Sequence, residues 1–522
     1  MGLLRSASIF SSLTLVSRVF GLIRDQILAI VFGPGAGLDA FWVAFKIPNF
    51  MRRLFAEGAF SQAFVPVLGE YKIQQGDDAV RELVGRVSGS LALVLLGITV
   101  AGILIFPWLI LKYGPSAIEN QHKLVLTAQM LVLTLPYIFF ISLTALAGGV
   151  LNTYERFAIP AFTPVFLNLC LIGVSLWLAP MMPAGYEVMA LAWGILLAGI
   201  VQLLFQFPFL ARLKMLTWPK YGFRHPGVIK IMRLMGPAIL GSAVVQINLM
   251  IDLIIAYTLL PDGSVSWLTF SDRLVEFPLG VFGIAIATVV LPSLSQHHAQ
   301  TDPARFSRVL DWGVRWSLLI GLPAMLGLTL LAGPLLTTLF NYGAFDQHDV
   351  LMSEMSLFAY AAGLLAFIFV KVLTPGFYSR QDTKTPVRIA VWAMLTNLAL
   401  NLGFVLPWLH YGLPGPHTGL AIATTLAASL NAGLLFLTLK RQGVYRVVPG
   451  WGRLLFQLLA ALLLMFLVLF FGVPELSDWF DWPYWQRALM LLVWVGAGGL
   501  VYIAGLYLFG FRFGKFRSEH KT

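Results

Sequence analysis

The sequence predicts an all-α membrane protein with about fourteen membrane-spanning helices, arranged as two parallel six-helix lobes around a central cavity plus two C-terminal helices. Three observations support this fold class: the composition, the long apolar runs and an internal repeat. Of the 522 residues, 58% are hydrophobic and 11% are charged. Soluble domains have roughly 45–50% apolar and about 25% charged residues. This composition therefore indicates an integral membrane protein.

Each expected helix is an apolar run of about 20 residues, the length needed to cross a bilayer. The runs are too long, and alternate too little, to be strands of a membrane barrel. The expected membrane-spanning segments are 9–32, 39–69, 86–111, 124–150, 158–179, 188–210, 231–258, 266–294, 310–339, 351–376, 387–407, 418–439, 454–473 and 488–510.

The cations of the connecting loops predict the orientation. If the N-terminus is cytoplasmic, the loops on the opposite side carry only Lys112, Lys123 and Arg487, and all other loop cations fall on the cytoplasmic side. Cytoplasmic loops of membrane proteins are enriched in Lys and Arg. We therefore expect a multi-pass protein with both termini in the cytoplasm.

Two separate matches indicate an internal repeat. The run "AFVPVLGEY" resembles "VVLPSLSQH", and aligning Pro66 with Pro292 gives an offset of 292 − 66 = 226 residues. The run "LNTYERFAIPAFTP" resembles "FYSRQDTKTPVRIA", and Pro160 and Pro386 give the same offset. Because six segments separate the copies, they share one orientation, as in transporters with parallel repeats and a site at the lobe interface. We expect a first lobe at 1–225, a second at 226–445, and two further helices with a cytoplasmic tail at 446–522.

Several ionisable residues fall inside the expected helices. A charge at the bilayer centre costs at least about 2.5–3.5 kcal/mol, so it should face a cavity or a partner. One interpretation is internal pairing, as in Arg24–Asp25, Arg53–Glu57 and Arg273–Glu276. The cations in these helices outnumber the acids, however. A guanidinium group is planar and can bind two phosphate oxygens at once. We therefore expect an anion-binding cavity lined by Arg18, Arg24, Asp25, Asp39, Lys46, Arg52, Arg53, Glu57, Asp272, Arg273, Glu276 and Lys371.

Long motifs carry a resemblance to a known family. The sequence contains "SRVFGLIRD", "DAFWVAFKIPNFMRRLFAEGAFSQAFVP", "MGPAILG", "SDRLVEFPLGVFGIAIATVVLPSLS" and "KVLTPGFYSRQDTKTP". These runs resemble the MurJ (MviN) family of lipid II flippases, within the superfamily of multidrug and polysaccharide exporters. The resemblance implies alternating access without ATP in the bacterial inner membrane, and cavity cations that hold the pyrophosphate and nearby sugar of lipid II.

The resemblance also bears on the last two segments and on partners. In the family these helices form a groove leading from the membrane into the cavity, and here no charge occurs from Leu454 to Pro474 or from Ala488 to Phe511. Such a groove suits the polyprenyl tail of undecaprenyl-pyrophosphate-linked disaccharide pentapeptide. We expect a monomer that contacts membrane lipids and not nucleic acid, and cell-wall synthases are candidate partners.

The repeat architecture predicts a transporter, and three common enzymatic motifs give no support to an enzyme. Nucleotide-binding, zinc-hydrolase and serine-hydrolase signatures are all missing from the sequence. Other interpretations are a flippase for a different lipid-linked oligosaccharide, a multidrug/cation antiporter, or a membrane glycosyltransferase. The antiporter should favour carboxylates over cations, and the glycosyltransferase should have a large catalytic loop.

The driving force is expected to be the membrane potential or an ion gradient. No cofactor is expected except an Na⁺ ion, for which Asp252, Asn397, Asn401 and Thr424 offer oxygen ligands of the kind that hard cations bind. The alternative is that Asn and Thr make ordinary interhelical hydrogen bonds and Asp252 is paired or protonated.

The predicted orientation can be tested by thiol labelling. In a Cys170→Ser background, cysteines introduced into 211–230 should resist an impermeant thiol reagent added outside spheroplasts, because that loop is expected in the cytoplasm. Cysteines at 341–349 or 476–481 should react. The opposite labelling pattern would overturn the orientation.

Overall fold

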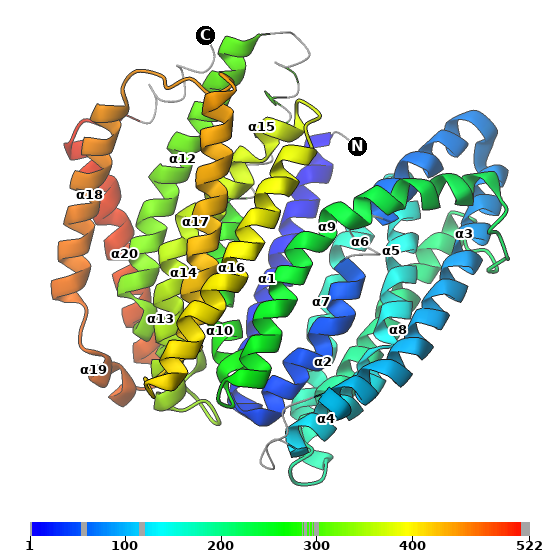
Figure 1. Ribbon diagram of the computed structural model, residues 1–522, viewed down its shortest axis with the longest axis horizontal. Helices are drawn as coiled ribbons and strands as arrows, with labels where there is room; N and C mark the ends of the chain where they lie inside the picture. Colours follow the sequence, from blue (N-terminus) through cyan, green and yellow to red (C-terminus); the bar gives the residue numbers. More distant parts are fainter. Residues whose placement is uncertain are drawn as a thin grey trace. The chain divides into compact units, whose positions relative to one another are not determined.

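The computed structural model describes residues 3–53, 60–113, 121–283 and 302–512, with a few single positions between 283 and 302 (Figure 1). Within this part the chain is helical and contains no strand. It forms two compact units, Met1–Ser266 and Trp267–Thr522. The lobe boundaries expected at 225 and 445 were derived from the sequence repeat, whereas these units are defined by compactness. The lobe boundaries therefore remain a prediction.

The first unit consists of helices that follow the expected segments closely. They are α1 (Leu3–Phe32), α2 (Ala36–Arg52), α3 (Ser61–Tyr113), α4 (Gln121–Thr134), α5 (Tyr137–Thr153), α6 (Ala158–Phe162), α7 (Pro164–Gly173), a π-helix (Val174–Leu178), a 3₁₀ turn (Ala179–Met181), α8 (Met189–Arg212) and α9 (Pro226–Leu259). The loop expected between 69 and 86 is instead part of α3, which bends at Gly76 with a φ of 81°. Only glycine adopts such a φ at little cost.

The core of the first unit joins α3, α5, α8 and α9. Phe64 and Leu83 of α3 pack with Val150 of α5, Leu210 of α8 and Ile231 of α9. This packing explains why α9 belongs to the first compact unit, although the sequence repeat assigns it to the second lobe.

The second unit begins inside α10 and contains the remaining helices. They are α10 (Ser264–Pro278), a π-helix (Leu279–Gly283), α12 (Pro303–Leu330), α13 (Ala332–Phe340), α14 (Gln347–Leu373), α15 (Pro375–Tyr378), α16 (Lys384–His410), α17 (Thr418–Arg441), α18 (Trp451–Gly472), α19 (Leu476–Asp481) and α20 (Tyr484–Leu508). α14 packs against α12 and α17, and α18 packs against α20.

The predicted repeat recurs as a repeated turn. Glu155 after α5 and Gln381 after α15 both have a left-handed backbone, with φ values of 60° and 62°. They lie 381 − 155 = 226 residues apart, at the predicted offset. In each turn the next amide donates to a carbonyl five residues earlier, Arg156 to Leu151 and Asp382 to Phe377. This is the hydrogen bond of a Schellman helix end, so the two copies share a local fold as well as a sequence pattern.

At one end, a buried ion pair within α12 fixes the α17–α18 connection and the start of α18 to that helix. Arg315 Nε lies 2.6 Å from Asp311 Oδ2. The hydroxyl of Tyr445 and the indole N–H of Trp451 both donate to Asp311 Oδ1, at 2.7 and 2.9 Å. Arg315 also donates to the carbonyls of Val448 and Pro449. These contacts hold the α17–α18 connection against α12.

At the other end of the second unit, Arg487 fixes α20 to the segment that follows α13. None of its partners among the described residues is acidic. Its guanidinium donates to the carbonyls of Trp482 and Phe480 at 2.9 Å each and to that of Asn341, after α13, at 3.2 Å. The side chain is 7% exposed. Arg487 was expected in a loop; the structure places it in the first turn of α20, buried among carbonyls.

Ten helices in the described parts of the chain are long and apolar enough to cross a membrane. They coincide with ten of the expected segments. The other four segments, at 9–32, 39–69, 231–258 and 266–294, are helical where they are described, and they carry most of the intramembrane charges. The chain is a multi-pass membrane protein.

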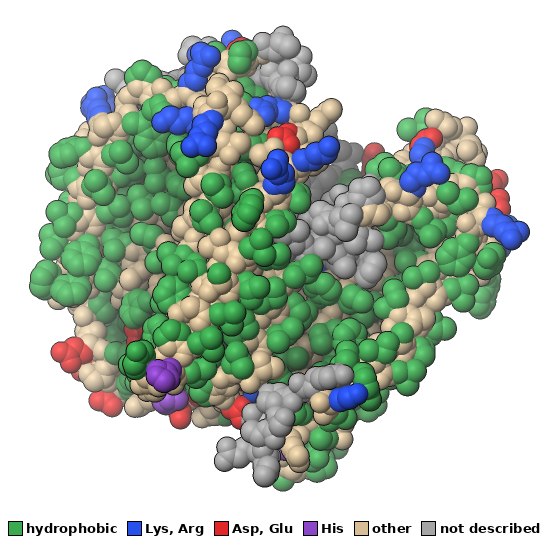
Figure 2. Space-filling view, viewed as in Figure 1, with side chains coloured by type: hydrophobic (Ala, Val, Ile, Leu, Met, Phe, Trp, Pro, Cys, Tyr) green, Lys and Arg blue, Asp and Glu red, His purple; other side chains and the backbone are tan. Residues whose placement is uncertain are grey.

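The surface charges of the second unit are separated between its two ends. Figure 2 shows Lys and Arg gathered near α15 and the α17–α18 connection, and Asp and Glu near α19 at the opposite end. The side chains between them are largely hydrophobic. This distribution is typical of a membrane-crossing body with one cation-rich face.

Candidate functional site

Arg24 and Asp25 form a buried ion pair on α1. They are 6% and 2% exposed. Arg24 donates to Asp25 Oδ1 from Nε and Nη2 at 2.9 and 2.6 Å, and to Asn168 Oδ1 of α7 from Nη1 at 3.0 Å. Asn168 in turn donates to the carbonyl of Ser17. The internal pairing considered for these two residues is therefore present, and Arg24 joins α1 to α7.

The remaining cations of α1 and α2 are half-buried: Arg18, Lys46, Arg52 and Arg53. Arg52 donates from Nε and Nη2 to Asn49 Oδ1 at 2.9 and 2.7 Å, which fixes the plane of its guanidinium group. Glu57, the expected partner of Arg53, lies outside the described residues.

The spacing along α2 gives these cations a common side. Asp39, Lys46 and Arg53 follow one another at intervals of seven residues, about two helical turns, so they lie on one face. Seven residues rise about 10 Å along a helix. Lys46 and Arg53 therefore continue, toward the other membrane surface, the face on which Asp39 is buried.

Asp39 is completely buried and accepts three hydrogen bonds. The donors are the backbone N–H of Gly263 at 2.8 Å, the backbone N–H of Ser266 at 2.9 Å and the Ser266 hydroxyl at 2.7 Å. Gly263 lies in the α9–α10 turn, and Ser266 lies in the first turn of α10. In this structure the Asp39 carboxylate is occupied by protein donors, and a role in contacting substrate remains a prediction.

Lys123 completes this polar cluster and was not identified from the sequence. Its ammonium lies 3.8 Å from Asp39 Oδ2, 2.6 Å from Asp262 Oδ1 and 4.5 Å from the ring centre of Tyr257. Lys123 was expected in a loop, but it lies in the first turn of α4 and is 3% exposed. The tyrosine hydroxyl hydrogen-bonds Thr127 at 2.7 Å. We call these residues, with Gly263 and Ser266, the Asp39 cluster; it joins α2, α4 and α9.

In the second unit, the predicted cavity residues lie on α10 and α14. Arg273 and Glu276 form an ion pair at 2.8 Å, with side chains 35% and 45% exposed. Asp272 and Lys371 are exposed in the isolated chain. These side chains remain accessible, unlike Arg24 and Asp39.

The four candidates for sodium binding are divided between the two units. Asp252 is half-buried on α9 of the first unit. Asn397 and Asn401 are fully buried on α16, which packs against α17, where Thr424 is half-buried. The burial of both asparagines suits the packing interpretation as well as the sodium interpretation, and the sodium site remains a prediction.

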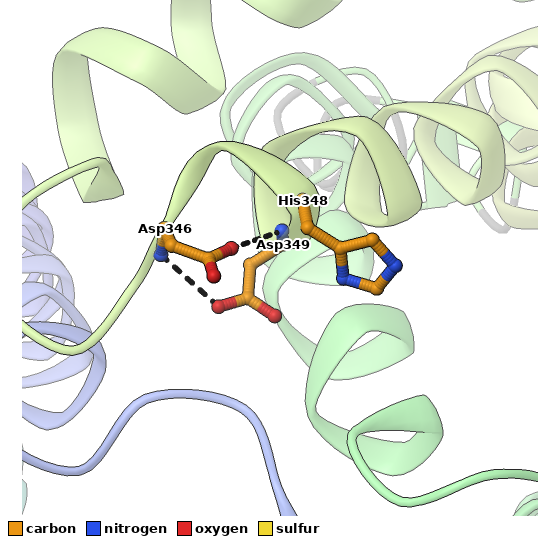
Figure 3. Close-up of side chains that lie close together, drawn as sticks. All are labelled: Asp346, His348 and Asp349. Atoms are coloured by element: carbon orange, nitrogen blue, oxygen red, sulfur yellow. Dashed lines mark hydrogen bonds between the residues drawn. The ribbon is translucent and has the colours of Figure 1, made fainter.

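One cluster among the described residues has the composition of a cation site: Asp346, His348 and Asp349 (Figure 3). Its carboxylates are already used. Asp346 Oδ1 accepts the Asp349 N–H at 2.9 Å, and Asp349 Oδ2 accepts the Asp346 N–H at 3.1 Å. Asp349 Oδ1 also accepts from Trp267 Nε1 at 2.8 Å. The cluster is therefore the N-terminal cap of α14.

Comparison with known proteins places the chain in a family. The family model described as "Lipid II flippase MurJ" matches residues 28–483. The "Probable lipid II flippase MurJ" of Vibrio cholerae is 45% identical over 98% of this chain and 97% of its own length. The "Lipid II flippase MurJ" of Burkholderia cenocepacia is 41% identical over the full length of both. The chain belongs to the MurJ family of lipid II flippases. The family is one of transporters and not of enzymes, as the sequence predicts.

Solved structures agree with this assignment. A MurJ structure described as an inward closed conformation matches with a TM-score of 0.77 and 26% identity, over 96% of this chain and 98% of that one. A MATE family multidrug transporter matches with a TM-score of 0.67 at 16% identity, over 84% of this chain. The second likeness concerns the fold alone.

The Asp39 cluster yields a stability prediction. Asp39→Asn puts an amide N–H₂ where a carboxylate oxygen accepts donors, so at least one buried donor loses its partner and Lys123 loses a counter-charge. We expect a loss of roughly 1.5–3 kcal/mol, seen as a lower melting temperature in detergent. As a control, Asp78→Asn alters an exposed pair with Arg81 and should change stability by less than about 0.5 kcal/mol. Equal melting temperatures for Asp39→Asn and the unaltered protein would contradict the role of the cluster.

Proposed function

We propose that this protein moves lipid II from the cytoplasmic to the outer leaflet of the bacterial inner membrane by alternating access. Membership of the MurJ family supports the substrate. The observation that carries the proposal is the set of half-buried cations on α1 and α2, Arg18, Lys46, Arg52 and Arg53. They lie on helices expected to cross the membrane, where a cation is costly unless it serves a ligand or a partner.

The pyrophosphate of lipid II suits these cations. A guanidinium group can donate two parallel hydrogen bonds to phosphate oxygens, whereas an ammonium acts as a point charge. Arg52 is held by Asn49 through Nε and Nη2. This contact orients the guanidinium plane before substrate arrives, which reduces the entropy lost on binding. We assign Arg273 and Lys371 to the same substrate from the second lobe.

The polyprenyl tail suits α18 and α20. Large apolar side chains are exposed along both helices, among them Leu463 and Phe470 on α18 and Leu492 and Leu500 on α20. Their attachment to α12 and α13 through Arg315 and Arg487 keeps this apolar surface in a fixed place. A tail lying on it remains in the bilayer while the polar head passes through the cavity.

An antiporter for cationic drugs, built on the same fold, is the competing function. A site for organic cations should present carboxylates. The acids of α1 and α2 in the described residues, Asp25 and Asp39, are both buried and paired, whereas the accessible charges there are cations. This distribution favours an anionic substrate. We also propose that the protein works as a monomer with both termini in the cytoplasm, and that cell-wall synthases receive its product.

Replacing Arg52 tests the substrate assignment. Arg52→Ala removes a charged donor pair, and we expect lipid II export to fall at least about tenfold. Arg52→Lys keeps the charge without the two-point contact and should restore only part of it. The measurement is lipid II on each leaflet after depletion of the native protein. Arg18→Ala should resemble Arg52→Ala.

The matched control is Arg212→Ala, an exposed arginine at the end of α8, which should leave export unchanged. Arg24→Ala is a poorer probe, because removing one partner of a buried pair can cost about 3–5 kcal/mol in stability. Normal export by both Arg18→Ala and Arg52→Ala would leave the pyrophosphate assignment without support.

For the driving force we propose the membrane potential or an ion gradient, and the two can be separated. The potential contributes about 2.3 kcal/mol per charge per 100 mV. If sodium binding at Asp252 drives transport, export should depend on sodium, and Asp252→Asn should abolish that dependence with the protein still folded. Export that follows an imposed potential and is unchanged by Asp252→Asn would exclude the sodium site and leave the potential as the driving force.

A further inference from the structure

The first unit contains a cavity lined by none of the residues predicted to bind substrate. It has a volume of about 420 Å³ and lies between α2, α3, α4 and α9. Its walls include Val43, Ile47 and Phe50 of α2 and Met250, Leu253 and Tyr257 of α9. This volume falls in the range of about 300–1,000 Å³ that small-molecule sites occupy.

The walls offer a ligand almost nothing polar. Two hydroxyl groups belong to lining residues, and both are engaged. The Tyr257 hydroxyl hydrogen-bonds Thr127 at 2.7 Å, and Thr258 donates to the carbonyl of Ile254 at 2.7 Å. A stable buried water needs about two to four polar partners. An empty cavity would leave its walls without dispersion contacts on one side. Between membrane-spanning helices, the remaining occupant is hydrocarbon.

The cavity has the depth of a lipid chain within one leaflet. From Met250 to Tyr257 the wall of α9 rises about 10 Å, and Tyr257 lies near the membrane surface where α3 ends and α4 begins. One leaflet contributes about 15 Å of hydrocarbon. A chain in the cavity would therefore reach most of the way from the surface to the bilayer centre.

A cation lies next to the surface end of this cavity. Lys112 of α3 is exposed and lies one helical turn beyond Leu109, a lining residue. Its ammonium stands 4.7 Å from the ring centre of Trp108. Trp and Lys in this arrangement are typical of the headgroup region. One ammonium matches the single negative charge of a phosphodiester better than the higher charge of a pyrophosphate.

We propose that this cavity binds one acyl chain of a bilayer phospholipid, with the phosphodiester of the same molecule at Lys112. The chain would pack against the helices that the Asp39 cluster joins. Val43 lies one turn from Asp39, Leu124 follows Lys123, and Tyr257 lines the cavity while its ring faces the Lys123 ammonium. The bound chain supports the arrangement of α2, α4 and α9. This inference does not rest on lipid II transport.

The test uses a photoactivatable lipid. The full-length protein is placed in nanodiscs of phosphatidylethanolamine and phosphatidylglycerol that contain a phosphatidylglycerol with a diazirine midway along one acyl chain. We expect labelling to concentrate on the peptides that carry Ile47, Phe106 and Met250, above the level on the lipid-exposed face of α18. Equal labelling of all lipid-facing helices would overturn the proposal, since bulk bilayer gives that pattern.

Cavity-filling variants test whether the acyl chain occupies this cavity. Ile47→Trp fills the cavity and should reduce labelling at Met250 to the level seen on α18. Leu104→Trp is the matched control, because Leu104 lies on α3, is 68% exposed and does not line the cavity; it should change nothing. If Ile47→Trp lowers the melting temperature, Met250→Trp serves as the cavity-filling variant instead, and labelling is then measured at Phe106. Labelling that persists in folded cavity-filling variants would overturn the proposal.

Two further experiments test the contact of the headgroup with Lys112 and the kind of lipid whose chain occupies the cavity. Lys112→Gln should reduce labelling by the phosphatidylglycerol probe, and unchanged labelling would remove the headgroup contact. A diazirine-bearing polyprenyl diphosphate should not compete with the phospholipid for this cavity. If it labels Ile47 and Met250 in preference to the phospholipid, the occupant is the tail of a polyprenyl substrate, and the phospholipid assignment is wrong.

Discussion

A charge inside a bilayer must be satisfied by the protein itself, and much of this structure follows from that constraint. The buried charged side chains of the described residues each contact an opposite charge, a backbone group or a polar side chain: Arg24, Asp25, Asp39, Lys123, Asp311, Arg315, Asp349 and Arg487. Replacing one partner of such a pair leaves the other buried and uncompensated, which is far more costly than losing an exposed pair. These groups therefore determine which helices remain together.

The same constraint divides the intramembrane charges into two groups with different tasks. Arg24 and Asp39 are buried, and their contacts join helices. Arg18, Lys46, Arg52, Arg53 and Lys371 remain half-buried or exposed, so their side chains are accessible to a ligand. A phosphate-binding role fits the second group. The contacts of the first group hold α1 against α7 and α2 against the start of α10.

The sequence predicted the elements well because hydropathy and loop charge report directly on the bilayer. It also predicted the repeat, and the turns at Glu155 and Gln381 show why: a left-handed helix end imposes the same local pattern on both copies. It could not separate structural from accessible charges. Lys123 and Arg487 looked like loop cations, since the groups that bury Lys123, and some of those that bury Arg487, lie far along the chain. Asp262 is 139 residues from Lys123, and Asn341 is 146 residues from Arg487.

The proposed alternating access would move the second repeat relative to the first, and the Asp39 cluster joins residues of both repeats. The α9–α10 turn belongs to the second repeat by sequence, whereas Asp39 and Lys123 belong to the first. Any movement of that turn away from α2 breaks hydrogen bonds to a charged carboxylate, each contributing about 1.5–3 kcal/mol. A state without these bonds is populated only if other contacts, or a ligand with higher affinity for that state, offset the loss. Substrate bound to the accessible cations is such a ligand only if it binds the two states unequally. Lys46 and Arg53 lie on the same face of α2 as Asp39, so a substrate bound to them, as proposed, would act on the helix that the cluster holds.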